Sequence, residues 1–107
     1  MTNKIVLRFT DSGIASEGHL WFQPDTAIRI IEQAKETKTP LLGFRAAVLK
    51  SASIQESLEH CWNYVRAKPP IQNSHDHAMQ FISIHRDFGL LFEVILPEFV
   101  GSGLSDL

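Results

Sequence analysis

The sequence is poor in cysteine and carries no strong charge of either sign, and both scarcities exclude classes of protein. Cys61 is the only cysteine among 107 residues, so no disulfide can form within the chain and a disulfide-built scaffold is excluded. The formal net charge is −2, whereas a nucleic-acid-binding domain normally needs a clustered basic face. We therefore expect no direct contact between this protein and nucleic acid.

Long apolar stretches are also missing. No run approaches the roughly 20 apolar residues of a membrane-spanning helix, and residues 1–9 lack the extended apolar region of a secretion signal. We therefore expect a cytoplasmic protein that does not bind a membrane. Hydrophobic residues still make up 44% of the chain, which suits a packed core and argues against disorder.

Recognisable catalytic motifs are missing as well. Gly13 and Gly18 lack the spacing and companion residues of a phosphate- or dinucleotide-binding loop. The acidic residues are scattered along the chain, so the sequence indicates no carboxylate pair for acid–base chemistry. We predict a protein that is not an enzyme, with no catalytic residues, no cofactor and no metal ligands.

The segment 21–49 carries the strongest structural pattern that is present. Pro24 suits the first turn of a helix, because its missing N–H would have no partner there, and Asp25 favours the positive helix end. Pro40 prevents the helix from continuing. The run over 41–49 is almost entirely apolar, so it predicts a strand buried on both faces and placed in the middle of a sheet.

Residues 53–66 give the clearest second helical pattern. Ser53 and Glu56 have the spacing of a capping box. Apolar residues recur every three or four positions from Ile54 to Val65, which predicts a helix with one buried stripe.

The remaining segments have shorter signals. Alternation over 4–10 predicts a half-buried strand, and 11–20 has the composition of a loop. A helix is predicted to begin at Asn73 or Ser74, since either residue suits an N-cap. The segment 90–96 is rich in strand-forming residues and predicts a last strand.

These elements together predict one domain over 1–107. About three strands and three helices in the order β-α-β-α-α-β indicate a small α+β domain with its helices packed on a small sheet. Residues 98–107 are expected to form a flexible tail.

The histidines leave an alternative function open. His75-Asp76-His77 invites a metal-binding interpretation, but residues two apart on a helix point away from each other. A solvated helix start accounts for the same residues. The alternative is a small enzyme or a metal- or ligand-binding domain that uses His19, His75 or His77 with nearby acids.

Cys61 also has two interpretations. It follows His60 directly, but neighbours on the predicted helix point about 100° apart, so His60 is badly placed to activate a nucleophile. Cys61 lies on the apolar stripe between Leu58 and Trp62. Because free cysteine is among the most buried residue types, we predict that both Cys61 and Trp62 belong to the core.

Residues 19–49 combine an early aromatic residue, a helix, and an apolar pair followed by a glycine at the start of a strand. The residues that make this pattern are Trp21, Ala27, Ile31 and Pro40-Leu41-Leu42-Gly43. The pattern resembles the bacterial immunity protein 40 family, found in polymorphic-toxin and contact-dependent growth inhibition systems. Its later features fit Trp62, Ser74, Ala78, Phe81 and the segment 90–96 loosely.

The resemblance implies a small cytosolic inhibitor that binds a cognate protein toxin domain and neutralises it. It implies neither catalysis nor a cofactor. Most such toxins attack nucleic acid, so the resemblance implies a nuclease with a basic cleft as the target. An inhibitor of such a cleft gains association rate and specificity from acidic groups around an aromatic anchor.

Candidates for that surface concentrate near 11–25. The predicted toxin-binding residues are Asp11, Glu17, His19, Trp21, Asp25 and Asp76. The same residues are also compatible with ordinary loop and helix-cap chemistry. For Trp21 in particular, the alternatives are an exposed anchor at a partner surface and a core anchor beside the helix.

Overall fold

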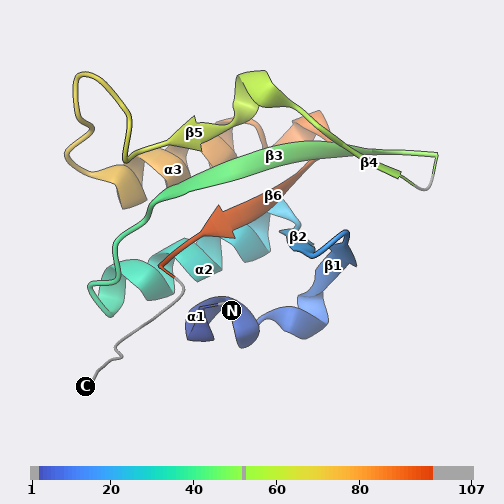
Figure 1. The fold of residues 1–107 in the computed structure, drawn as a ribbon, viewed down its shortest axis with the longest axis horizontal. Coiled ribbons are helices and arrows are strands. Elements are labelled where there is room, and N and C mark those ends of the chain that lie inside the picture. The colour runs from blue at the N-terminus through green and yellow to red at the C-terminus, as the bar shows by residue number, and fades with distance from the viewer. Residues whose placement is uncertain (1–2, 52, 98–107) are drawn as a thin grey trace.

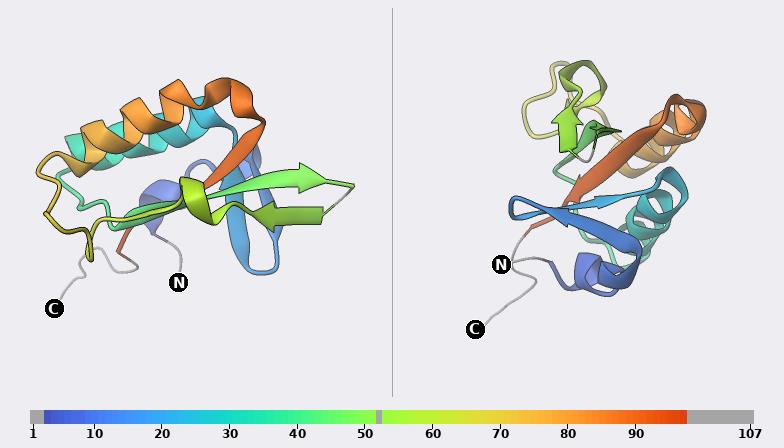
Figure 2. Two further views of the ribbon diagram at one scale, coloured as in Figure 1. Left: turned by 90° about the horizontal axis from the view of Figure 1, so that it is seen from above. Right: turned by 90° about the vertical axis from the view of Figure 1, so that its right-hand side faces the viewer.

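The computed structural model describes residues 3–51 and 53–97, and in them a six-stranded antiparallel sheet carries its helices on one face (Figures 1 and 2). The strands are β1 (Gly13–Ser16), β2 (His19–Phe22), β3 (Gly43–Lys50), β4 (Ser53–Glu56), β5 (Trp62–Asn63) and β6 (Leu90–Ile95). The α-helices are α1 (Lys4–Leu7), α2 (Pro24–Glu36) and α3 (Ser74–Ile84), and short 3-10 turns are η1 (Thr10–Ser12), η2 (Leu58–His60) and η3 (Arg86–Phe88).

The strand order is β1-β2-β6-β3-β4, and β5 also pairs with β3. The α+β class is confirmed, whereas the predicted three strands and the order β-α-β-α-α-β are wrong. No helix in the described ranges combines the length and the apolar character needed to cross a membrane. The predicted tail over 98–107 lies outside the described residues.

The first element is a helix rather than the predicted strand over 4–10. The side-chain oxygen of Asn3 accepts a hydrogen bond from the backbone N–H of Ile5 at 2.8 Å and so caps α1. Ile5 and Val6 are adjacent and both buried, which a strand with one solvated face does not allow. The alternation was too short to outweigh the cap that precedes it.

A hairpin replaces most of the loop predicted over 11–20. The pairing of Ser16 with His19 leaves Glu17 and Gly18 as a two-residue turn, and their φ angles are 51° and 82°. Positive φ at both central residues is typical of a type I′ turn, whose backbone twist matches the twist of the paired strands. Glutamate is unusual at a turn position with positive φ, and both strands are only four residues long. The sequence pattern of a hairpin was therefore weak.

The helix predicted from Pro24 is confirmed as α2, with Pro24 in its first turn. Its end is a Schellman motif, in which the N–H of Thr39 bonds to the carbonyl of Ala34 at 2.8 Å and the N–H of Lys38 to that of Lys35 at 3.2 Å. Lys38 has a φ of 58° there. Glycine normally occupies this left-handed position, because it has no Cβ to clash.

The predicted strands over 41–49 and 90–96 are confirmed as β3 and β6. They pair from Gly43 opposite Ile95 to Val48 opposite Leu90. On its other side β3 pairs with β4 and β5, so β3 lies inside the sheet as expected. The helix predicted from Asn73 or Ser74 is confirmed as α3, with Asn73 at the N-cap position.

The helix predicted over 53–66 is wrong, because this segment forms β4, η2 and β5. Ser53 does not act as an N-cap; its hydroxyl donates to the carbonyl of Lys50 at 2.9 Å, at the turn between β3 and β4. Pairing with β3 therefore outweighs the local helical pattern. Gly43 makes the approach of β5 possible, because a Cβ at Gly43 would collide with the carbonyl oxygen of Trp62. Trp62 is half-buried and packs against the core from β5.

The main core lies between the sheet and α1, α2 and α3. Phe22, Phe44 and Phe92 are its largest fully buried aromatic residues, and each comes from a different strand of the sheet. The Phe44 ring lies 5.8 Å from Phe92 and 5.4 Å from Phe81 of α3. Aromatic contacts therefore attach α3 to the middle of the sheet.

Candidate functional site

The face of the sheet opposite the helices has its own small buried group. Trp21, Ala47 and Leu91 form this group, and each directly precedes or follows a residue of the main core in the same strand. Because successive side chains of a strand point to opposite faces, the three lie on the face that α2 and α3 leave uncovered (Figure 2). We call this surface the open face. It comprises Ile14, His19, Trp21, Arg45, Ala47, Leu49, Ile54, Glu56, Leu91 and Glu93.

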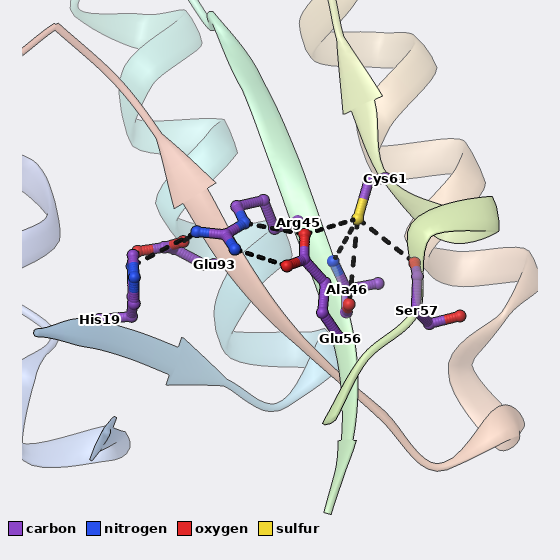
Figure 3. Close-up of polar contacts among 7 residues, drawn as sticks. All are labelled: His19, Arg45, Ala46, Glu56, Ser57, Cys61 and Glu93. Atoms are coloured by element: carbon purple, nitrogen blue, oxygen red, sulfur yellow. Dashed lines mark hydrogen bonds and ion pairs between the residues drawn. The ribbon is translucent and has the colours of Figure 1, made fainter. Parts of the chain in front are cut away.

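A chain of charged side chains crosses the open face from β4 to β2 (Figure 3). Arg45 donates two hydrogen bonds to Glu56, from Nε to Oε2 at 3.0 Å and from Nη2 to Oε1 at 2.5 Å. Its Nη1 also donates to Oε1 of Glu93 at 3.3 Å. The other carboxylate oxygen of Glu93 lies 2.8 Å from Nδ1 of His19. Four strands are thus joined by side-chain contacts as well as by backbone pairing.

These contacts change the acidity of the groups involved. The hydrogen bonds from Arg45 lower the pKa of Glu56 below its ordinary value, although partial burial opposes the change. The same bonds raise the pKa of Arg45. Both groups are therefore held in their charged forms, and the pair is a fixed feature of the open face.

Cys61 is half-buried beside this chain and lies outside any helix. Its Sγ accepts a hydrogen bond from the backbone N–H of Ala46 at 3.3 Å and lies 3.3 Å from the carbonyl oxygen of Ser57 (Figure 3). Burial raises the pKa of the thiol, which disfavours the nucleophilic thiolate. Cys61 thus fixes the end of η2 against β3, and its predicted place in a helical core stripe is corrected to this position.

Arg45 borders two hollows. The smaller has a volume of about 240 Å³, and its lining includes Glu17, His19 and Trp21 as well as Arg45 and Glu56. The guanidinium carbon of Arg45 lies 5.9 Å from the centroid of the Trp21 ring, within the range of a cation–π contact.

The larger hollow has a volume of about 510 Å³ and lies beside β5, where Cys61, Val65 and Arg66 line it. Val65 is 71% exposed. Of the residues that the structure describes, Arg45 is the one that lines both hollows.

Three of the predicted toxin-binding residues meet at the smaller hollow, and three do not. Glu17, His19 and Trp21 line it together. Asp25 pairs with Arg86 at 2.8 Å and Asp76 with Lys35 at 2.6 Å, both outside the open face. Asp11 lies in η1, at the end of β1 away from the Glu17 turn. Only three of the six predicted residues thus share one surface, and their binding to a toxin stays a prediction.

Trp21 is only 4% exposed. Of its two predicted roles, the exposed anchor is therefore wrong and the core anchor is confirmed. Trp21 lines the smaller hollow although it is buried, and its indole packs against Ala47 and Leu91.

Arg45, Glu56 and Glu93 were missed as site residues. Arg45 is the only charged residue of the apolar run 41–49 and Glu93 the only one of β6, and a charge among apolar residues is costly unless it is paired. A charged residue within an apolar run therefore indicated a paired charge, but which residue pairs with it depends on strand order. Glu56 was predicted to form a capping box with Ser53 at the start of a helix, and its contact with Arg45 depends on the strand pairing that this prediction missed.

His75 and His77 have partners within the fold. The Nε2 of His75 lies 2.8 Å from the carbonyl oxygen of Thr39, and the Nδ1 of His77 lies 2.8 Å from the hydroxyl of Tyr64. Over residues 3–51 and 53–97, no group of three or more His, Cys, Asp or Glu side chains is arranged to hold a metal ion.

Comparison with known proteins adds no family to this description. No protein-family model matches the chain, and no curated protein matches it significantly. The function of the chain is therefore inferred from the geometry of the open face and from the sequence pattern of residues 19–49.

Proposed function

We propose that this chain is a binding protein whose open face docks on another protein. The observation that carries the proposal is that α2 and α3 pack on one face of the sheet and leave the other uncovered (Figure 2). On the same face, Ile14 of the edge strand β1 is 40% exposed and Leu49 near the end of β3 is 56% exposed. Apolar side chains grouped with polar ones on an uncovered surface are typical of interaction sites.

The partner that fits this surface is a protein with a basic patch. Around the smaller hollow, Glu17, Glu56 and Glu93 oppose the single guanidinium of Arg45, which gives these residues a formal charge of −2 when His19 is neutral. Each carboxylate has lone pairs beyond those that Arg45 and His19 use. Lysine or arginine side chains of a partner can bind there, and complementary charge raises both association rate and specificity.

The specific function that we propose is neutralisation of a cognate toxin domain in the cytoplasm by stoichiometric binding. The resemblance to immunity proteins around Trp21 and Pro40–Gly43 supports this proposal. A nuclease toxin suits the charge argument, because an enzyme that binds a phosphate backbone needs a basic cleft. The chain would then act by covering that cleft rather than by chemistry of its own.

The alternative, a small enzyme or ligand-binding domain, is best centred on His19. Its imidazole pairs with Glu93 and lines the hollow of about 240 Å³ and another of about 330 Å³ between β2 and β6. The gene neighbourhood discriminates between the two functions. A toxin-tipped exoprotein gene directly upstream favours the immunity protein, and a metabolic operon favours the alternative.

The experiment is a titration of the toxin domain encoded beside this gene. Purified toxin is assayed with increasing amounts of the chain, and complex mass is measured by light scattering. We expect toxin activity to fall to zero at one chain per toxin. Full toxin activity with an equimolar chain at micromolar concentration would contradict the proposal, as would a stable homodimer that excludes the toxin.

A further inference from the structure

Two histidines that are far apart in sequence meet between η2 and the end of α3. The ring centroids of His60 and His85 are 5.1 Å apart, and their planes are inclined by 72°. The Phe81 ring stacks on His85 at 4.2 Å, and the Phe88 ring lies 4.9 Å from His85 and 6.1 Å from His60. Both imidazoles are half-buried in this aromatic surround, which belongs to neither hollow beside Arg45.

Each imidazole is held by its Nδ1 atom. The Nδ1 of His85 lies 2.8 Å from the carbonyl oxygen of Phe81, and a carbonyl only accepts, so Nδ1 carries the proton and Nε2 keeps a free lone pair. The Nδ1 of His60 lies 2.8 Å from the hydroxyl of Ser57. Among the described residues, no hydrogen bond reaches Nε2 of either ring. Metal-binding histidines are typically oriented in this way, through the nitrogen that does not bind the metal.

The distance between the rings also fits a shared ion. A zinc–nitrogen bond of roughly 2.0–2.1 Å and a nitrogen-to-centroid distance of about 1.1 Å place two tetrahedrally arranged imidazole centroids about 5.2 Å apart. The observed separation is 5.1 Å. Imidazole nitrogen is a preferred ligand of Zn²⁺, Ni²⁺ and Cu²⁺.

We propose that His60 and His85 together form a binding site for one divalent transition-metal ion such as Zn²⁺, and that each histidine binds the ion through its Nε2 atom. No third His, Cys, Asp or Glu of the described residues completes the site. Water fills the remaining coordination positions, and the affinity is therefore in the micromolar range rather than that of a closed structural site. This site is separate from the open face and does not depend on the proposed function.

The test is a Zn²⁺ titration of protein without an affinity tag, followed by calorimetry and by NMR of the histidine ring protons. We expect one bound ion, with the largest shifts at His60 and His85. The variants His60→Phe and His85→Phe keep an aromatic ring and remove the ligand atom, and each should weaken binding by at least about tenfold. His19→Gln is the matched control, because His19 with Glu93 is the competing surface site, and it should leave the affinity unchanged.

Several results would overturn the proposal. These are the absence of Zn²⁺ binding, binding that neither phenylalanine variant weakens, and binding that His19→Gln abolishes. Thermal midpoints without metal report whether each variant is folded. If a variant is unfolded, the ring protons of the wild-type protein decide: shifts confined to His60 and His85 support the site, and their absence refutes it.

Discussion

Arg45 and Glu56 face each other diagonally across β3 and β4, where Nε and Nη2 of the guanidinium donate to the two carboxylate oxygens at 3.0 and 2.5 Å. Glu56 is directly opposite Ala47 in the register, so Arg45 reaches along the strand to meet it. This bidentate contact holds the short strand β4 against β3 and fixes the guanidinium above Trp21. It therefore sets both the shape and the charge of the open face.

Replacing Arg45 should destabilise the fold. Arg45→Met leaves Glu56 and Glu93 without their shared partner, and we expect a loss of about 1–2 kcal/mol in the free energy of unfolding after allowing for partial exposure. Urea denaturation measures this loss. The control is Lys35→Met, which removes an exposed ion pair with Asp76 and should cost less than about 0.5 kcal/mol. Equal effects of the two variants would show that the network adds nothing beyond a surface pair.

The lowered pKa of Glu56 predicts a dependence of stability on pH. A carboxylate whose pKa is lower in the folded state stabilises the fold above its unfolded pKa, and this contribution is lost as pH falls through the folded value. The ordinary value is 4.5. Wild type should therefore exceed Glu56→Gln in stability at neutral pH, and the difference should shrink below about pH 4.5. Urea denaturation of both proteins across this range measures it; a difference that stays constant with pH would contradict the assignment.

The left-handed Lys38 predicts a stabilising substitution. Lys38 has a φ of 58° in the Schellman motif after α2, so Lys38→Gly should raise the free energy of unfolding by about 0.5–1 kcal/mol through relief of the Cβ clash. Glu36→Gly, within the last turn of α2, is the control and should lower it by about 1 kcal/mol. Thermal unfolding of both variants measures these changes, and destabilisation by Lys38→Gly would contradict a left-handed conformation of Lys38 at the end of α2.

Gly43 tests whether 53–66 is strand and turn rather than helix. An alanine Cβ at this position would collide with the carbonyl of Trp62 in β5, so Gly43→Ala should cost about 1–3 kcal/mol. Substitution of an exposed strand position such as Lys50→Ala provides the reference and should change stability by less than about 0.5 kcal/mol. A Gly43→Ala protein as stable as wild type would restore the helical interpretation of this segment.

Several elements were predictable because their signals are local. Pro24 begins α2, the apolar run gives β3, Asn73 precedes α3, and the β-branched and aromatic residues before Pro97 give β6. The errors fall where tertiary pairing outweighs a short local pattern. The stripe from Ile54 to Val65 has helical spacing, yet β3 offers backbone partners to both β4 and β5.

The candidate site was predictable only in part for a related reason. Glu17, His19 and Trp21 are close in sequence and share one hairpin, so reasoning along the chain grouped them. Arg45 and Glu93 meet because β3 and β6 are neighbours with Arg45 opposite Glu93. Strand order and register are not determined by the sequence of any one segment, and the centre of the open face depends on both.

The most direct test of the central claim is to change the open face and measure toxin binding by calorimetry and surface kinetics. The double variant Glu17→Lys with Leu49→Asp alters its rim, and Glu36→Lys with Ile84→Asp makes the same charge changes at exposed positions of α2 and α3. We predict that the first weakens binding by at least about 30-fold, because it places a positive charge against a basic partner and a carboxylate in an apolar contact, and that the second stays within about threefold of wild type. Wild-type affinity in the open-face variant, or equal losses in both, would contradict the claim that the protein acts through this face.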